Sequence, residues 1–238
     1  MSHLHIPDGV LPPPLWGGGL ALALALLAAS SAAARRGAPA RAGVQGALGA
    51  LMLAVMSIPI PPFALEYCLT LAGPVGVLLG PAAAFQTVFV VSVILALLGQ
   101  GGMTVVGLNA LVLGAGAAVA RPLFRQLTRW LAPPAALAGA TALGQLASGA
   151  LWFAVLAAAF GADPSRPIPA GGPDGHGHGA RLTLFAGLTF MLWAVAVFAE
   201  AGIAYGVGRF LARVRPDLLP PAVGRDAQAA GPRREGSP

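Results

Sequence analysis

Apolar residues gather in seven runs along the chain, separated by short stretches rich in proline, glycine and arginine. A helix that crosses a bilayer needs about 20 apolar residues. Six runs approach or reach this length and predict transmembrane helices: 15–34, 44–58, 85–98, 105–120, 135–160 and 182–211. The run 69–80 has about a dozen residues, with glycine and proline inside it, and predicts a short or broken helix packed within protein. The pattern therefore predicts an all-α integral membrane protein with about seven transmembrane helices, one of them short.

The composition supports this class. Of the 238 residues, 57% are hydrophobic and 9% are charged, whereas soluble domains carry about 25% charged residues. The formal net charge of +6 comes from arginines, but these stand at the ends of apolar runs, so we expect membrane lipid and not nucleic acid around the chain. Cys68 is the only cysteine, which excludes an internal disulfide.

The arginines also indicate the topology. Arg35, Arg36 and Arg41 close the first run, and the positive-inside rule places them in the cytoplasm, leaving the N-terminus extracytoplasmic. If the short run 69–80 crosses the membrane, the arginines in 121–129 and 209–215 are cytoplasmic too. We therefore count it as a crossing and predict a cytoplasmic C-terminus. The first run has a proline-rich entry and a basic exit, so we expect no cleavable signal peptide.

Unusual polar chemistry precedes the first run. His3 and His5 lie within five positions of the amine of Met1. A terminal amine, a deprotonated backbone amide and an imidazole form fused chelate rings around a square-planar ion, and nitrogen donors in that geometry favour Ni(II) or Cu(II). The residues alone thus predict a metal-capturing N-terminus. The alternative is that both histidines are ordinary residues of a flexible terminus.

The segment His5-Ile6-Pro7-Asp8-Gly9, followed by Val10-Leu11-Pro12, resembles the opening of substrate-capture (S) components of cobalt and nickel energy-coupling-factor transporters, the CbiM/NikM type. Members of that family begin Met-His-Ile-Pro-Asp-Gly and bind the ion with the N-terminus itself. Here Met1-Ser2-His3-Leu4 precedes the motif. Three arrangements remain open: initiation at the codon of Leu4, removal of Met1 so that His3 comes second, or retention of Met1 with His3 third.

Three further stretches resemble the same family. In Glu66-Tyr67-Cys68-Leu69-Thr70, aligned on Leu78-Leu79-Gly80-Pro81, Cys68 stands where the family has a second histidine. The stretch Gly101-Gly102-Met103-Thr104 through Asn109 resembles the family's Gly-Gly-Leu-Thr-Thr-Leu-Gly-Ala-Asn, and 200–219 resembles its C-terminal helix and exit. The likeness extends from His5 to Leu219.

The resemblance implies the metal ligands. The amine, His5 and Cys68 would be donors, with His3 as an alternative and Glu66 as a weaker candidate; Cys68 could instead be a small buried thiol. Asn109 should face the protein interior, where it could fix the N-terminal loop, orient a ligand by a hydrogen bond, or join two helices. We expect Glu200, an acid inside an apolar run, to pair with backbone or Asn. His176 and His178, on a glycine-rich loop, would bind metal weakly.

The implied function is that of the membrane substrate-binding subunit of an ATP-driven Ni²⁺ or Co²⁺ importer, not an enzyme, with no resident cofactor. Its partners would be an energy-coupling transmembrane (T) subunit, paired ATPases and possibly a small accessory membrane subunit, in a bacterial or archaeal plasma membrane. We expect a metal-capturing segment (1–14), a transmembrane bundle (15–219) and a disordered cytoplasmic tail (220–238). Two other classes stay open: a metal-dependent intramembrane enzyme and an ATPase-independent metal permease.

Overall fold

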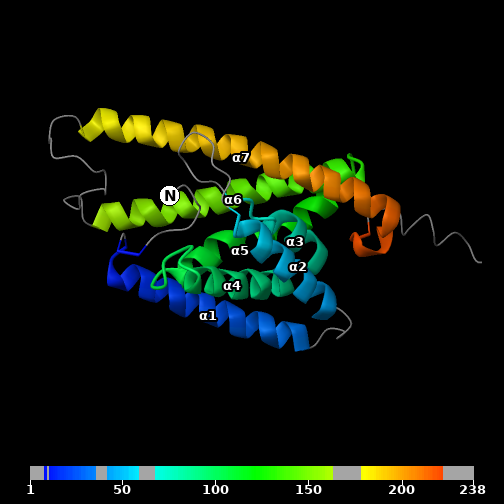
Figure 1. Ribbon diagram of the computed structural model, residues 1–238, viewed down its shortest axis with the longest axis horizontal. Helices are drawn as coiled ribbons and strands as arrows, with labels where there is room; N and C mark the ends of the chain where they lie inside the picture. The colour runs from blue at the N-terminus through cyan, green and yellow to red at the C-terminus, as the bar shows by residue number, and fades with distance from the viewer. Residues whose placement is uncertain (1–7, 10, 36–41, 59–67, 163–177, 222–238) are drawn as a thin grey trace, which may run out of the picture.

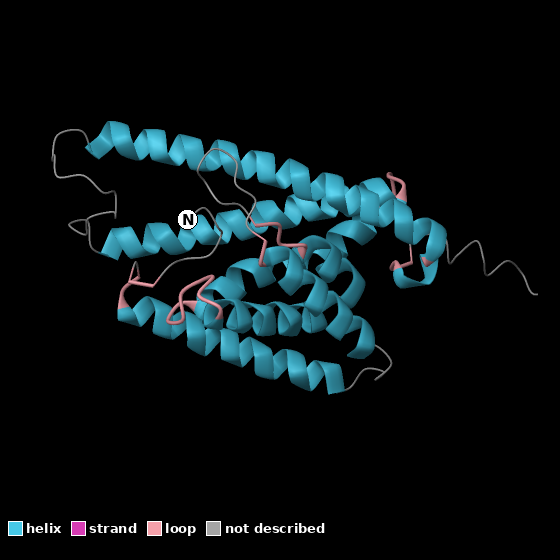
Figure 2. Ribbon diagram, in the orientation of Figure 1, coloured by secondary structure: helices cyan, strands magenta, loops and turns pink. Residues whose placement is uncertain are grey.

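Seven α-helices form the described part of the chain in this computed structural model, which describes residues 8–9, 11–35, 42–58, 68–162 and 178–221. They are α1 (Pro13–Arg35), α2 (Ala42–Met56), α3 (Ala72–Leu79), α4 (Pro81–Leu97), α5 (Val106–Leu127), α6 (Pro133–Ala162) and α7 (His178–Val214), followed by a 3-10 helix, η2 (Pro216–Leu218). Figures 1 and 2 show a helical bundle without strands over these residues. The predicted all-α fold with one short helix is confirmed.

Four of these helices are long and apolar enough to cross a membrane, counting only described residues: Pro13–Ala34 in α1, Val106–Leu127, Pro133–Ala159 in α6 and Trp193–Val214 in α7. The helices α2 and α4 are apolar but shorter. Large apolar side chains are exposed on the outside of the bundle; Phe198 on α7 is 78% exposed and Leu22 on α1 is 54% exposed. Such a surface suits contact with lipid chains, because in water it would promote association.

The short helix α3 lies inside the bundle. Its eight residues span about 12 Å at 1.5 Å per residue, far less than the roughly 30 Å hydrocarbon core. All eight are buried, and a Cβ at Gly76 would collide with the backbone carbonyl of Ala117 on α5. Glycine is therefore required for α3 to lie directly against α5, which explains the glycine and proline in this run.

The helix α5 extends further than the sequence predicted. We expected it to end near residue 120, with the arginines following it, but the helix continues through Pro122 to Leu127 and carries Arg121 and Arg125. Arginine is a good helix former and can extend a membrane helix into the interface. The C-terminal ends of α1, α5 and α7, where arginines gather, lie toward the same end of the bundle in Figure 1. This arrangement fits the predicted topology, while the orientation itself stays a prediction.

Candidate functional site

The structure describes some of the predicted site residues. Cys68 and Asn109 are described and buried, with 8% and 2% of their surface exposed. His3, His5, Glu66, the N-terminal amine and His176 lie outside the described residues. His178, expected in a loop, is instead the first residue of α7. Among the described residues, no three His, Cys, Asp or Glu side chains form a group that could hold a metal.

Asp8 fastens the N-terminal segment to the loop between α4 and α5. Its Oδ2 accepts a hydrogen bond from the backbone N–H of Met103 at 2.9 Å, and its Oδ1 accepts one from the N–H of Thr104 at 2.9 Å. The hydroxyl of Thr104 also donates to Oδ1. Both N–H groups belong to residues that precede Val105, the N-cap residue of α5. The carboxylate therefore holds the loop immediately before α5 from a distant part of the sequence.

Gly102 makes this approach possible. A Cβ at Gly102 would lie 2.6 Å from Oδ1 of Asp8 and 2.7 Å from its backbone nitrogen. Three residues after Asp8, Leu11 is 4% exposed and packs in a cluster with Val105, Leu108 and Ala159. The segment is thus held on the start of α5 by three hydrogen bonds and by apolar contact. Sequence reasoning quoted both Asp8 and Gly102 in motifs but gave neither of them a role.

The hydrogen bonds that Asp8 accepts from Met103 and Thr104, here called the anchor, should depend on pH. The hydroxyl of Thr104 is the main cause that lowers the pKa of the Asp8 carboxyl below its ordinary 3.8. Because the anchored form has the lower pKa, anchoring is fully present above about pH 4 and is lost as the pH falls through the lowered value. We expect hydrogen exchange at the amides of Met103 and Thr104, normalised to the intrinsic rate at each pH, to lose protection at acidic pH. In Asp8→Asn protection should be weaker and independent of pH; an equal acid dependence in that variant would contradict the prediction.

A second set of contacts holds the segment that carries Cys68. The backbone N–H of Thr70 donates to Oε1 of Glu200 on α7 at 2.7 Å, and the Thr70 hydroxyl donates to Oε2 at 3.0 Å. The side-chain amide of Gln145 on α6 donates to Oε2 of Glu200 and, at 2.8 Å, to Oγ1 of Thr70. All three residues are at most 4% exposed. The cluster therefore joins residues 68–71 to two long helices.

This cluster explains the acid inside a membrane helix. A carboxylate away from water is costly unless donors satisfy it, and here a backbone N–H, a hydroxyl and an amide all point at Glu200. The expectation of a backbone partner is confirmed; the side-chain partners shown are Thr70 and Gln145. Gln145 was missed, although a glutamine in the middle of an apolar run is itself a signal, since polar side chains in membrane helices face polar partners.

The backbone that follows Cys68 is unusual. Leu71 precedes α3 with φ 53° and ψ 15°, the left-handed region, which is uncommon for a bulky residue and costs about 1–3 kcal/mol. The neighbouring Thr70 is held by Glu200 and Gln145, and these bonds offset the strain. The turn directs the chain from Cys68 into α3. Cys68 is thus buried, and the chain two residues after it is held by the hydrogen bonds of Thr70.

Comparisons with known proteins agree on one class. A family model described as CbiM, "Cobalt uptake substrate-specific transmembrane region", matches residues 5–218. A solved structure described as a transition metal transporter superimposes with a TM-score of 0.71 at 23% identity, covering 88% of this chain and 93% of that one. A second, described as a truncated transition metal transporter, gives 0.70 at 22% identity, covering 87% and 98%. No curated protein matches the sequence.

Proposed function

Because this chain belongs to the CbiM family, the substrate-specific transmembrane regions of cobalt uptake, we propose that it is the metal-binding membrane subunit of an ATP-driven importer and captures Co²⁺ or Ni²⁺ with its N-terminal segment. The chain is a multi-pass membrane component of metal transport. The two solved structures of the same fold are described as transition metal transporters, which supports a divalent transition metal as the cargo.

The anchoring of Asp8 carries this proposal. His5 lies three residues before Asp8, so its Cα lies within about 11 Å of the Cα of Asp8, the reach of three extended residues. With Asp8 held by Met103 and Thr104, chain connectivity would limit how far the imidazole can move from the α4–α5 loop. Confinement of this kind lowers the entropy that the segment would lose on binding an ion.

The ligand set proposed is the terminal amine, the backbone amide and imidazole of His5, and Cys68, with His3 as an alternative. Glu200 accepts the backbone N–H of Thr70 and Gln145 donates to the Thr70 hydroxyl, so both would hold the chain two residues after Cys68. Asn109, buried on α5, would stabilise the surroundings of the site. Amide and thiol must each lose a proton to bind the ion, so affinity should fall as the pH falls.

Energy would come from other chains. The sequence contains no phosphate-binding loop, and the proposal assigns ATP hydrolysis to paired ATPases that act through an energy-coupling T subunit. The chain itself would bind and release the cargo and catalyse no reaction. Uptake by this chain in vesicles without those partners would support the permease alternative and count against this part of the proposal.

The test begins with the purified protein in detergent. Intact-mass measurement defines the N-terminus, and calorimetric titration of Co²⁺ and Ni²⁺ in two buffers of different ionisation enthalpy counts the protons released. We expect about one ion per chain, proton release on binding, and about one proton fewer with weaker binding in Cys68→Ala. His5→Ala should abolish tight binding.

The matched control is the double variant His176→Ala/His178→Ala, which removes two imidazoles outside the proposed ligand set and should bind as the unaltered chain does. Tight binding that survives His5→Ala but is lost in this control would move the site to His176 and His178. Binding without proton release would exclude the amide and thiol as ligands.

A further inference from the structure

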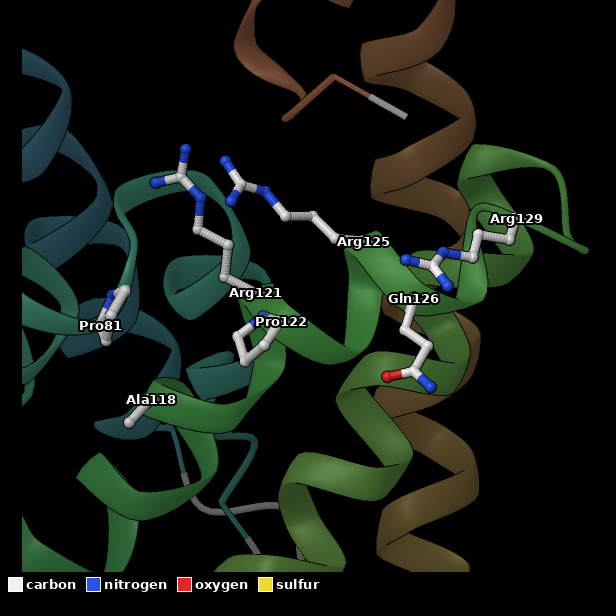
Figure 3. Close-up of a pocket in the computed structure, with 7 residues that line it drawn as sticks. All are labelled: Pro81, Ala118, Arg121, Pro122, Arg125, Gln126 and Arg129. Carbon is white, nitrogen blue, oxygen red and sulfur yellow. The ribbon is translucent and has the colours of Figure 1, made fainter. Parts of the chain in front are cut away.

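A cavity of about 410 Å³ opens at the end of the bundle where arginines gather. It is lined by Pro81, Ala118, Arg121, Pro122, Arg125, Gln126 and Arg129, and Figure 3 shows these side chains. Three guanidinium groups and one amide thus line it, and among the described residues the lining contains no carboxylate. A cavity of this size suits a small ligand rather than a single bare ion.

Two of the three arginines lie on one side of α5, and the third follows just after the end of the helix. Arg121, Arg125 and Arg129 are spaced by four residues, so the two within α5 lie on the same face, one turn apart. Figure 3 shows Arg121 and Arg125 extending from the helix in the same direction. Like charges at this spacing destabilise a helix. Each guanidinium presents a fork of donors suited to phosphate oxygens.

The start of α4 adds to the positive potential. Pro81 lines the cavity and is the first residue of α4. The residue before it, Gly80, provides no side-chain cap, and the first turn of this 17-residue helix contains no acid. A Cβ at Gly80 would lie 2.5 Å from the guanidinium nitrogen of Arg121, so Arg121 lies directly against this helix start. Unpaired N–H groups in a first turn favour negative charge.

The position of the cavity along α5 would place it at the depth of lipid headgroups. Its arginines are at the end of α5, a helix long enough to span the bilayer. Trp130, the residue after Arg129, is 72% exposed, and tryptophan collects at the boundary between headgroups and hydrocarbon. Arg125 and Arg129 are exposed as well. Basic cavities between helices at this depth bind anionic headgroups.

We propose that this cavity, the arginine pocket, binds the headgroup phosphate of an anionic phospholipid through Arg121, Arg125 and Arg129. The lipid would bridge the start of α4 and the end of α5, and with the predicted topology it would come from the cytoplasmic leaflet. The proposal is independent of metal capture, because the pocket is built from the opposite end of α5 to the one that holds Asp8.

Native mass spectrometry of the full chain in mixed micelles tests it. With equal amounts of phosphatidylglycerol and phosphatidylcholine, we expect one retained lipid, predominantly phosphatidylglycerol, and at least a fivefold loss of that adduct in Arg125→Gln/Arg129→Gln. Arg121 is left in place because it packs against Gly80. The matched control, Arg209→Gln/Arg213→Gln, removes the same charge from the end of α7, outside the pocket lining, and should retain the adduct.

Equal loss in both double variants would show general charge attraction and overturn the proposal, as would retention without preference between the two lipids. Competition with inorganic phosphate distinguishes a lipid site from a site for a free anion. If phosphate at millimolar concentration displaces the lipid completely and raises the melting temperature as much as phosphatidylglycerol does, the pocket is a site for a free anion and the lipid assignment is wrong. Phosphate that neither displaces the lipid nor stabilises the chain supports it.

Discussion

Glu200→Ala is expected to release the segment that carries Cys68. The substitution leaves the N–H and hydroxyl of Thr70 and the amide of Gln145 without their shared acceptor, and each buried donor so orphaned costs about 1–3 kcal/mol. Hydrogen bonds between membrane helices contribute at the lower end of such ranges, so we expect roughly 2 kcal/mol of local destabilisation. Because 1.4 kcal/mol is a factor of ten, this corresponds to an increase of about 30-fold in transient opening.

The single cysteine reports this opening directly. Cys68 is 8% exposed and is the only thiol in the chain, so its maleimide labelling rate follows the opening of residues 68–71. Labelling should be faster in Glu200→Ala by roughly that 30-fold factor. The labelling rate of Glu200→Gln should lie between those of the unaltered chain and Glu200→Ala. The new side chain keeps one acceptor oxygen, but its amide donor would face the amide of Gln145.

Asp217→Ala is the matched control. It removes an acid that pairs with Arg215 at 2.9 Å where both side chains are more than half exposed, and exposed ion pairs contribute about 0–1 kcal/mol. Its labelling rate should be that of the unaltered chain. Equal rates in Glu200→Ala and the unaltered chain would show that Glu200 does not hold this segment.

Gly102→Ala is expected to dislodge the N-terminal segment. The added Cβ would lie 2.5 Å from Cγ2 of Val105 and within 2.7 Å of two atoms of Asp8, closer than real contacts allow, so Asp8 must move off the loop. Protection of the Met103 and Thr104 amides should fall. Under the proposed function, affinity for Co²⁺ or Ni²⁺ should drop by about 10- to 100-fold, the range for groups that orient metal ligands.

Gly18→Ala provides the control for this prediction. Gly18 lies near the start of α1, and a Cβ there meets nothing within 4 Å, so amide protection and metal affinity should be unchanged. The two readouts also separate two conclusions. If Gly102→Ala loses amide protection but keeps its metal affinity, the Asp8 contacts hold the N-terminal segment but have no role in metal capture.

The sequence determined the helical class and the positions of most helices. A bilayer requires long apolar runs, and such a run can be recognised in the sequence without knowing which helices pack beside it. Its hydrophobic pattern also identified 69–80 as a short helix. Helix ends were less certain: α4 begins at Pro81, since proline suits a first turn, and α5 continues beyond the apolar run to Leu127.

The resemblance to the CbiM/NikM type, read from His5-Ile6-Pro7-Asp8-Gly9 and three later motifs, is confirmed by the family match over residues 5–218. The ligand assignments stay predictions, with His3, His5 and Glu66 outside the described residues. Cys68 is placed, but its part in metal binding is still a proposal.

Only the tertiary structure decided which polar groups meet. Asp8 and Thr104 are separated by 96 residues and Thr70 and Glu200 by 130, and no local pattern pairs groups so distant. The Thr70–Glu200 pairing arises because helix packing brings a carboxylate to a buried backbone donor that has lost water and must find an acceptor. The Asp8 pairing is exposed, and it arises because the chain before α1 passes beside the α4–α5 loop. The sequence predicted that an acid inside a membrane helix needs a partner. Which partner Glu200 finds depends on how α3, α6 and α7 pack together.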